Sequence, residues 1–153
     1  MSDLYCLACK KYHHHNYHKC DVLSLVPVTR RCRTLADRLY SMGIDLFGVA
    51  HFSQKVVGSE NKYVINVIIE LKQITQIGIL GDNFPIKWKV HTETYSSDRT
   101  KLVVPILAYY ETYLYDGGKS ADERTQEVID EFIKYLENYD PDGVKSIITL
   151  MYS

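Results

Sequence analysis

Long apolar runs are missing from this sequence. No stretch approaches the roughly 18 consecutive apolar residues that cross a bilayer, and the first residues lack the charged-then-apolar run of a secretory signal. We therefore expect a soluble, cytoplasmic protein with no membrane partner. In a reducing compartment, cysteines are more often thiols or metal ligands than disulfides, so the four cysteines do not predict a disulfide framework.

The motifs of the common enzyme classes are missing as well. The sequence has no Walker loop, no dinucleotide-binding glycine pattern, no Gly-x-Ser-x-Gly elbow and no His-Glu-x-x-His. It also has no internal repeat and no low-complexity linker. Because 46% of the residues are apolar and 24% are charged, the composition is that of a folded domain and not of a disordered chain. These absences favour a non-enzymatic protein.

Hydrophobic periodicity predicts one α+β domain over residues 28–153. A helix is expected over 29–42, where apolar residues share one face and Gly43 follows, and another after Ser120, where a capping box begins. Residues 144–152 favour a third helix, although their β-branched side chains also allow a strand. Strands are predicted at 47–52, 62–71, 86–94 and 101–113. This order predicts a four-stranded antiparallel sheet with the N-terminal helix and the two C-terminal helices packed on one face.

Residues 1–27 form a Cys/His-rich N-terminal segment. Three of the four cysteines and four of the six histidines lie within residues 6–20. Thiolate and imidazole are the ligands that tetrahedral zinc prefers, and a Cys-x2-Cys pair presents two sulfurs from one short turn. The segment predicts a zinc clamp, structural because protein groups fill all four positions, and its candidate ligands are Cys6, Cys9, His14, His15, His18 and Cys20. The alternative is a surface segment that binds no metal.

The same fifteen residues resemble a retroviral zinc knuckle, in which Cys-x2-Cys is followed by x4-His-x4-Cys. His14 gives spacings of four and then five residues, and His15 gives five and then four. Residues 10–12 are Lys-Lys-Tyr where the knuckle has glycines. The resemblance implies a zinc-stabilised nucleic-acid-binding module.

Charge is separated along the chain although the formal net charge is −1. The opening forty residues are basic and the closing forty are acidic. Guanidinium groups and aromatic rings together can grip phosphates and stack on bases, and the candidate binding residues are Arg30, Arg31, Arg33, Arg38, Tyr12 and Tyr17. A pI of about 6.6 lies below the values of dedicated nucleic-acid-binding domains. We therefore expect a macromolecular partner or a small anionic ligand first, with nucleic acid as the alternative, and a homo-oligomer as a further possibility.

The remaining cysteine and histidines give no catalytic pattern. Cys32 lies on the apolar face of the predicted first helix, as a small buried hydrophobe does. His51 and His91 lie in predicted strands with no acid or nucleophile at a motif spacing. A hydrolase or transferase would require them to converge in a pocket with an acid such as Glu70 or Glu93.

The general profile is a Tyr-, Ile- and Lys-rich α+β domain without enzyme motifs. In this it resembles the small accessory proteins encoded by phages and prophages of low-GC bacteria. The resemblance implies a protein that acts by binding, either occluding a host or defence enzyme or sequestering a nucleotide-like ligand.

Overall fold

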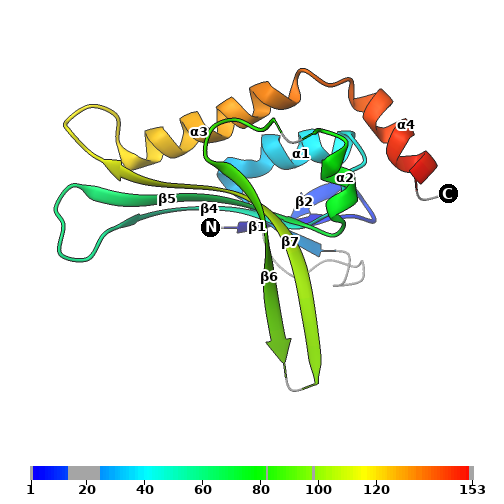
Figure 1. Cartoon of the computed structure of the whole chain (residues 1–153), viewed down its shortest axis with the longest axis horizontal. Helices are drawn as coiled ribbons and strands as arrows, with labels where there is room; N and C mark the ends of the chain where they lie inside the picture. The colour runs from blue at the N-terminus through cyan, green and yellow to red at the C-terminus, as the bar shows by residue number, and fades with distance from the viewer. Residues whose placement is uncertain (1, 14–24, 82, 98, 152–153) are drawn as a thin grey trace.

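The computed structural model of the chain describes residues 2–13, 25–81, 83–97 and 99–151. Seven strands in this part of the chain form one sheet in the order β2-β1-β3-β4-β5-β7-β6 (Figure 1). They are β1 (Ser2–Cys6), β2 (Lys11–His13), β3 (Leu25–Thr29), β4 (Leu46–Lys55), β5 (Lys62–Leu71), β6 (Trp88–Ser97) and β7 (Thr100–Leu114).

The predicted four-stranded antiparallel sheet is wrong, because the sheet is seven-stranded and mixed. β3 pairs in parallel with β4, where Val28 lies opposite Val49. A parallel pair needs a crossover, which the helix between the two strands provides. β1 and β2 add an antiparallel hairpin beyond β3. The four strands β4 to β7 match the predicted ones within a few residues.

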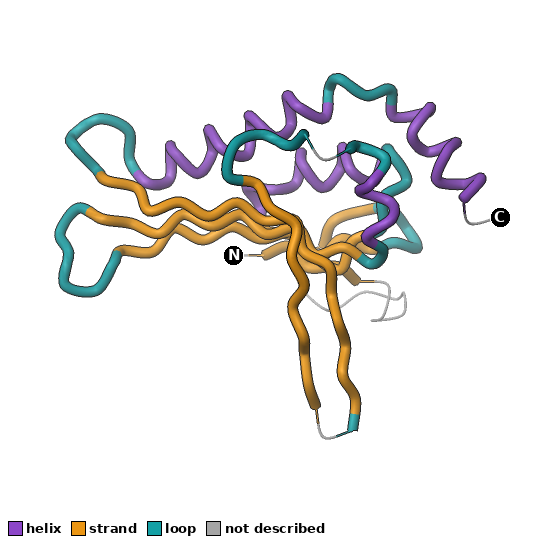
Figure 2. The backbone as a smooth tube through the Cα atoms, in the orientation of Figure 1, coloured by secondary structure: helices purple, strands orange, loops and turns teal. Residues whose placement is uncertain are grey.

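The described residues form five helical segments beside the sheet: η2 (Arg30–Cys32), α1 (Arg33–Ser41), α2 (Ile74–Gly78), α3 (Ala121–Leu136) and α4 (Pro141–Met151). α1, α3 and α4 lie on the same side of the sheet (Figure 2). The predicted capping box at α3 is confirmed, since Ser120 Oγ accepts from Glu123 N and the Glu123 side chain accepts from Ser120 N. The weaker helix prediction after residue 144 is confirmed by α4. No described helix has both the length and the apolar character that crossing a bilayer requires.

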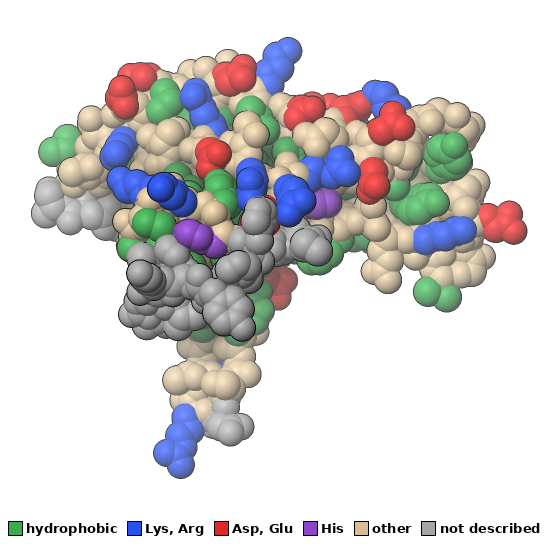
Figure 3. Space-filling model, turned by 180° about the vertical axis from the view of Figure 1, so that it is seen from behind, with side chains coloured by type: hydrophobic (Ala, Val, Ile, Leu, Met, Phe, Trp, Pro, Cys, Tyr) green, Lys and Arg blue, Asp and Glu red, His purple; other side chains and the backbone are tan. Residues whose placement is uncertain are grey.

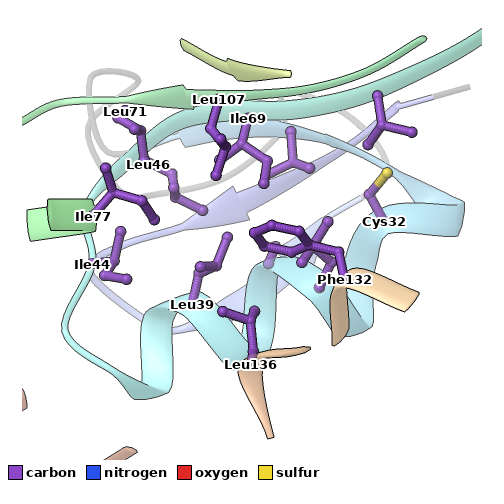
Figure 4. Packing of buried hydrophobic residues seen from close by; sticks show 14 of the residues in the cluster. Cys32, Leu39, Ile44, Leu46, Ile69, Leu71, Ile77, Leu107, Phe132 and Leu136 are labelled. Carbon is purple, nitrogen blue, oxygen red and sulfur yellow. The ribbon is translucent and has the colours of Figure 1, made fainter. Parts of the chain in front are cut away.

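The core lies between the sheet and the layer of α1 and α3. Leu39 from α1 and Phe132 from α3 meet Ile69 and Leu107 from the central strands, and all four are fully buried (Figure 4). The Phe132 ring lies with its centroid 4.3 Å from that of Trp88. Burial of large apolar side chains is the main favourable term in folding, so this layer fixes the ends of β3, β4 and η2 in space.

β6 and β7 continue past the rest of the sheet as a two-stranded hairpin (Figures 1 and 2). Ten consecutive residue pairs join the two strands, from Trp88 opposite Tyr109 to Ser97 opposite Thr100. Trp88 anchors the start of β6 in the core, whereas the other nine residues of that strand are exposed. We call residues 89–97 and 99–103 the arm.

Candidate functional site

The candidate site is a shallow pocket where β3 ends and η2 begins. Arg30 and Arg31 come from η2, His51 from the middle of β4 and Gln126 from α3, and together they line a volume of about 410 Å³. The parallel β3–β4 pair brings η2 beside β4, so residues twenty positions apart in sequence share one pocket. No acidic residue is among the described residues that line it. The pocket therefore presents donor groups to an anion.

His51 is held at the base of this pocket by neighbouring polar groups. Its Nδ1 lies 2.8 Å from Thr29 Oγ1 and 3.9 Å from Cys32 Sγ. Burial lowers the pKa of His51 below its usual 6.5, and the positive charge of Arg31 lowers that pKa further. The imidazole is therefore uncharged at neutral pH, and a bound anion would favour its protonation.

Arg31 is oriented by a contact with α3. Its Nη1 donates to Gln126 Oε1 at 3.4 Å, while Gln126 Nε2 donates to Asp130 Oδ1 at 2.8 Å. The Gln126 amide is thus turned so that its oxygen faces the guanidinium. This arrangement holds Arg31 at the pocket without placing a carboxylate against it.

Two of the four candidate arginines are used inside the fold. Arg33 Nη2 lies 2.6 Å from Oδ2 of Asp3, whose side chain is 1% exposed. Arg38 Nη2 donates to the backbone carbonyl of Tyr139 at 3.2 Å and so ties α1 to the residues after α3. Arg30 is different, because its side chain is 60% exposed and lies 3.5 Å from Asp3. Of the four, Arg30 and Arg31 line the pocket.

Tyr12 also joins the structural contacts of α1. Its hydroxyl donates to Asp37 Oδ1 at 2.7 Å, and the Arg33 guanidinium lies 4.4 Å from the centre of its ring. Burial and the hydrogen bond to Asp37 raise the pKa of Tyr12 well above its usual value. The ring is therefore covered by Arg33 on one face. Tyr17, the other candidate aromatic residue, lies outside the described residues.

The Cys-x2-Cys pair lies at the turn between β1 and β2. Lys10, directly after Cys9, has φ +58°, and its N–H donates to Cys6 O at 2.8 Å, which closes a tight turn around the pair. Cys6 is buried, and Cys9 Sγ lies 3.4 Å from His13 Nε2. Within the described parts of the chain, no three His, Cys, Asp or Glu residues lie close enough to hold a metal ion. The other candidate ligands, His14, His15, His18 and Cys20, lie outside the described residues.

The two other chemical candidates from the sequence do not form a catalytic group. Cys32 is fully buried, and desolvation raises its pKa, which keeps it a thiol. His91 lies on β6, which two strands, β5 and β7, separate from β4 in the sheet, and its Nε2 is 3.3 Å from Glu93 Oε1. His51 and His91 therefore do not converge in one pocket.

A second charged cluster lies between β7 and α3 and is internally neutralised. Arg124 Nε lies 2.9 Å from Glu111 Oε2, Tyr109 donates to the same oxygen at 2.9 Å, and Arg124 also contacts Glu127. Burial and the bond to Glu111 raise the pKa of Tyr109 to about 12. Burial alone would raise the pKa of Glu111, but the bonds from Arg124 and Tyr109 outweigh it and lower that pKa. This cluster holds α3 to the sheet.

Basic side chains gather across the middle of one face of the molecule, beside histidine (Figure 3). An acidic depression on α3 borders the pocket and shares Gln126 with it; its other lining residues are Glu123, Glu127, Asp130, Glu131 and Lys134. The basic and the acidic surfaces therefore meet at Gln126.

No family model, curated protein or solved structure matches this chain.

Sequence reasoning did not select three residues that the structure brings to these sites. His51 and Gln126 join Arg30 and Arg31 only through the β3–β4 pairing and the docking of α3, neither of which has a local sequence signal. His13 is one of the four histidines of the Cys/His-rich segment, but it was not among the candidate ligands.

Proposed function

We propose that this chain is a non-enzymatic binding protein that takes a phosphate-type anionic group in the Arg30–Arg31–His51 pocket. The observation that carries the proposal is the convergence of two guanidinium groups, an imidazole and an amide in one pocket, with no carboxylate among its described lining residues. Guanidinium groups bind carboxylates and phosphates through paired, charge-assisted hydrogen bonds.

The groups around the pocket favour binding without catalysis. The thiol nearest to the imidazole belongs to Cys32, which is fully buried and has a raised pKa, so it is a poor nucleophile. The pocket is shallow and open to solvent, which suits a phosphate group better than the enclosure of a whole substrate. The ligand is then a nucleotide-like molecule or a phosphate group of a larger partner. A role in sequestering a nucleotide, or in occluding a host or defence enzyme, would follow from the phage-type profile.

The test is a calorimetric titration with inorganic pyrophosphate. The Arg30→Gln/Arg31→Gln variant should weaken binding by about tenfold or more, because two charge-assisted contacts are lost. Lys62→Gln/Lys134→Gln removes the same charge from exposed positions elsewhere and serves as the control. Equal affinities in the two variants would show that any binding follows net charge and would reject the pocket.

The pH dependence of pyrophosphate binding provides an independent readout. Since His51 has a lowered pKa in the ligand-free fold and an anion favours the imidazolium, binding takes up a proton. Affinity should rise as the pH falls through the pKa of the bound state, and His51→Gln should flatten this rise. A slope that survives in the variant would assign the proton uptake to another group.

We also propose, as a second candidate function, a zinc-stabilised nucleic-acid-binding module. A specific observation favours the zinc: the tight turn around Cys6 and Cys9 and the 3.4 Å separation of Cys9 Sγ from His13 Nε2. Sulfur and nitrogen ligands of one tetrahedral zinc lie about 3.5 Å apart, so His13 joins the candidate ligands.

Metal analysis and Co²⁺ substitution test the zinc proposal. We expect about one zinc per chain, a thiolate-to-cobalt absorption band, and loss of that band in Cys9→Ser. Cys32→Ser is the matched control, and a metal-free, folded protein would reject the site. Titration with short single-stranded RNA and DNA over a salt series tests the nucleic-acid part, which a flat salt dependence would exclude.

A further inference from the structure

The arm presents a long edge of the sheet that no described strand covers. β6 is the last strand in the sheet order, and its residues 89–97 are all exposed. On β7, residues 100–103 are exposed as well. A two-stranded ribbon is at best marginally stable in water by itself. We therefore expect another polypeptide segment to cover the free edge of the arm when the protein is functional.

The side chains of the arm point to the same conclusion. Val90, Tyr95, Leu102 and Val103 are 45–57% exposed and are divided between the two faces of the ribbon. Val90 and Val103 are on the helix-facing side with Trp88, and Tyr95 and Leu102 are on the other. Solvated edges normally avoid such residues.

The edge carries the charged residues Lys89 and Glu93, but it lacks two other devices that block strand pairing, namely proline and bulges. β6 has no proline and no glycine, and its register with β7 runs without a bulge. Thr92 lies opposite Pro105, whose ring nitrogen has no hydrogen to donate. We infer that Thr92 and Pro105 form a pair without hydrogen bonds to each other. Alternate residues of an antiparallel ladder direct their N–H and C=O groups to opposite sides, so these groups of Thr92 then point to the free edge.

We propose that a second copy of this chain covers the arm, with the two β6 strands paired antiparallel around a two-fold axis at Thr92. In this register Thr92 faces the partner's Thr92 and can exchange two backbone hydrogen bonds with it. Glu93 faces the partner's His91, and Lys89 faces the partner's Tyr95. Each of these pairs occurs twice by symmetry, and each is of a kind that stabilises antiparallel sheets.

Neighbouring registers are less favourable for identifiable reasons. Residues that face each other in an antiparallel pair have their side chains on the same face of the sheet. The two-fold axis can therefore move only from one residue to another along the strand. An axis at His91 would place two imidazoles opposite each other, and an axis at Glu93 would place two carboxylates opposite each other. Among these three registers, only the axis at Thr92 avoids placing two titratable side chains of the same kind opposite each other, and in that register β6 is complementary to a second copy of itself.

An apolar groove lies beside the proposed seam. Ile77, Phe84, Trp88 and Val90 are among the residues lining a volume of about 520 Å³ at the base of the arm. In the register around Thr92, Ser96 of the partner subunit lies opposite Trp88, so the far end of one arm runs along the base of the other. This would shield the groove as well as the edge.

This inference does not rest on the anion pocket, which involves η2, β4 and α3. Its first test is light scattering coupled to size-exclusion chromatography. The proposal predicts a particle of twice the 17.7 kDa chain mass. A particle of the chain mass at every concentration up to the solubility limit would overturn it.

Charge reversal then tests the register. Glu93→Lys sets the new lysine against the partner's His91, and His91→Glu sets two carboxylates against each other, so each variant alone should dimerise about tenfold or more weakly. Mixing the two variants should restore dimers, because both cross-strand pairs are then complementary. The pair of His91 with Glu93 inside one chain, at 3.3 Å, is not repaired by mixing. Glu60→Lys, in the exposed turn before β5, is the charge-matched control.

Thr92→Pro tests the backbone contact without a change of charge. It removes the outward N–H at the proposed axis and should abolish the dimer while circular dichroism and thermal unfolding stay near those of the wild type. Full-strength dimers in Thr92→Pro, or single charge variants that dimerise as well as their mixture, would place the interface elsewhere and overturn the proposal.

Discussion

Arg33→Met should destabilise the fold without weakening anion binding. Arg33 Nη2 lies 2.6 Å from the carboxylate of Asp3, which is 1% exposed. Breaking a buried ion pair by removing one partner costs about 3–5 kcal/mol, because a charge stays buried. Arg33 is one-third exposed, and Arg30 lies 3.5 Å from the same oxygen, so we expect the lower end, about 3 kcal/mol.

The assay is urea unfolding followed by circular dichroism, with thermal unfolding alongside. A loss of about 3 kcal/mol corresponds to a fall in Tm of roughly 6–12 °C for a domain of this size. Arg30→Met is the control and should stay within about 1 kcal/mol of the wild type, since the Arg30 side chain is mostly exposed and Arg33 still pairs with Asp3. Asp3→Asn combined with Arg33→Met should recover part of the loss. The reasoning is refuted if Arg33→Met costs less than about 1 kcal/mol, or if it weakens pyrophosphate binding as strongly as the pocket variant.

Three further perturbations follow from the core, from the Arg124 cluster and from His51. Phe132→Ala should cost about 3–5 kcal/mol in urea unfolding, because the ring is fully buried against Trp88; a loss below about 1 kcal/mol would contradict the packing described. The pKa of Glu111 is lowered in the fold, so its contribution to stability is present above pH 4.5 and is lost as pH falls through that lowered value. Arg124→Ala should flatten this acid-side loss, and unfolding curves between pH 3 and 6 that keep the wild-type slope would disagree. The pKa of His51 is lowered in the fold, so the unfolded chain takes up a proton first as the pH falls below 6.5. The free energy of unfolding should therefore decline in this range. His51→Gln should remove the decline, as measured by urea midpoints at pH 7.5 and 5.

The sequence was sufficient to predict the helices and strands that carry a local signal, such as a capping box or a regular spacing of apolar residues. The helix after Ser120 carries its start signal in four residues, and the strand over 62–71 has an apolar residue at every second position from Tyr63 to Leu71, so both were placed correctly. The β-rich middle of the chain was also recovered, because hairpins join strands that are neighbours in sequence.

The N-terminal strands could not be predicted in the same way. β1 and β2 have five and three residues and mix polar and apolar side chains, so they show no clear alternation. β3 has Pro27 at its centre, and a proline in a short apolar run argues against a paired strand. Its parallel partner β4 lies beyond a helix, and such non-local pairing leaves no local signal.

The candidate site was predictable only in part for the same reason. The sequence shows that Arg30 and Arg31 belong to a basic stretch, but it does not distinguish them from Arg33 and Arg38 in the same stretch. What separates them is Asp3 and the carbonyl of Tyr139, which the fold brings from opposite ends of the chain.

The most direct test of the central claim is a titration of ¹⁵N-labelled protein with inorganic pyrophosphate, followed by amide chemical shifts. The account predicts saturable shifts centred on Arg30, Arg31, His51 and Gln126, with the arm unchanged. An absence of shifts at these four residues, or saturable shifts centred on another part of the molecule, would contradict it.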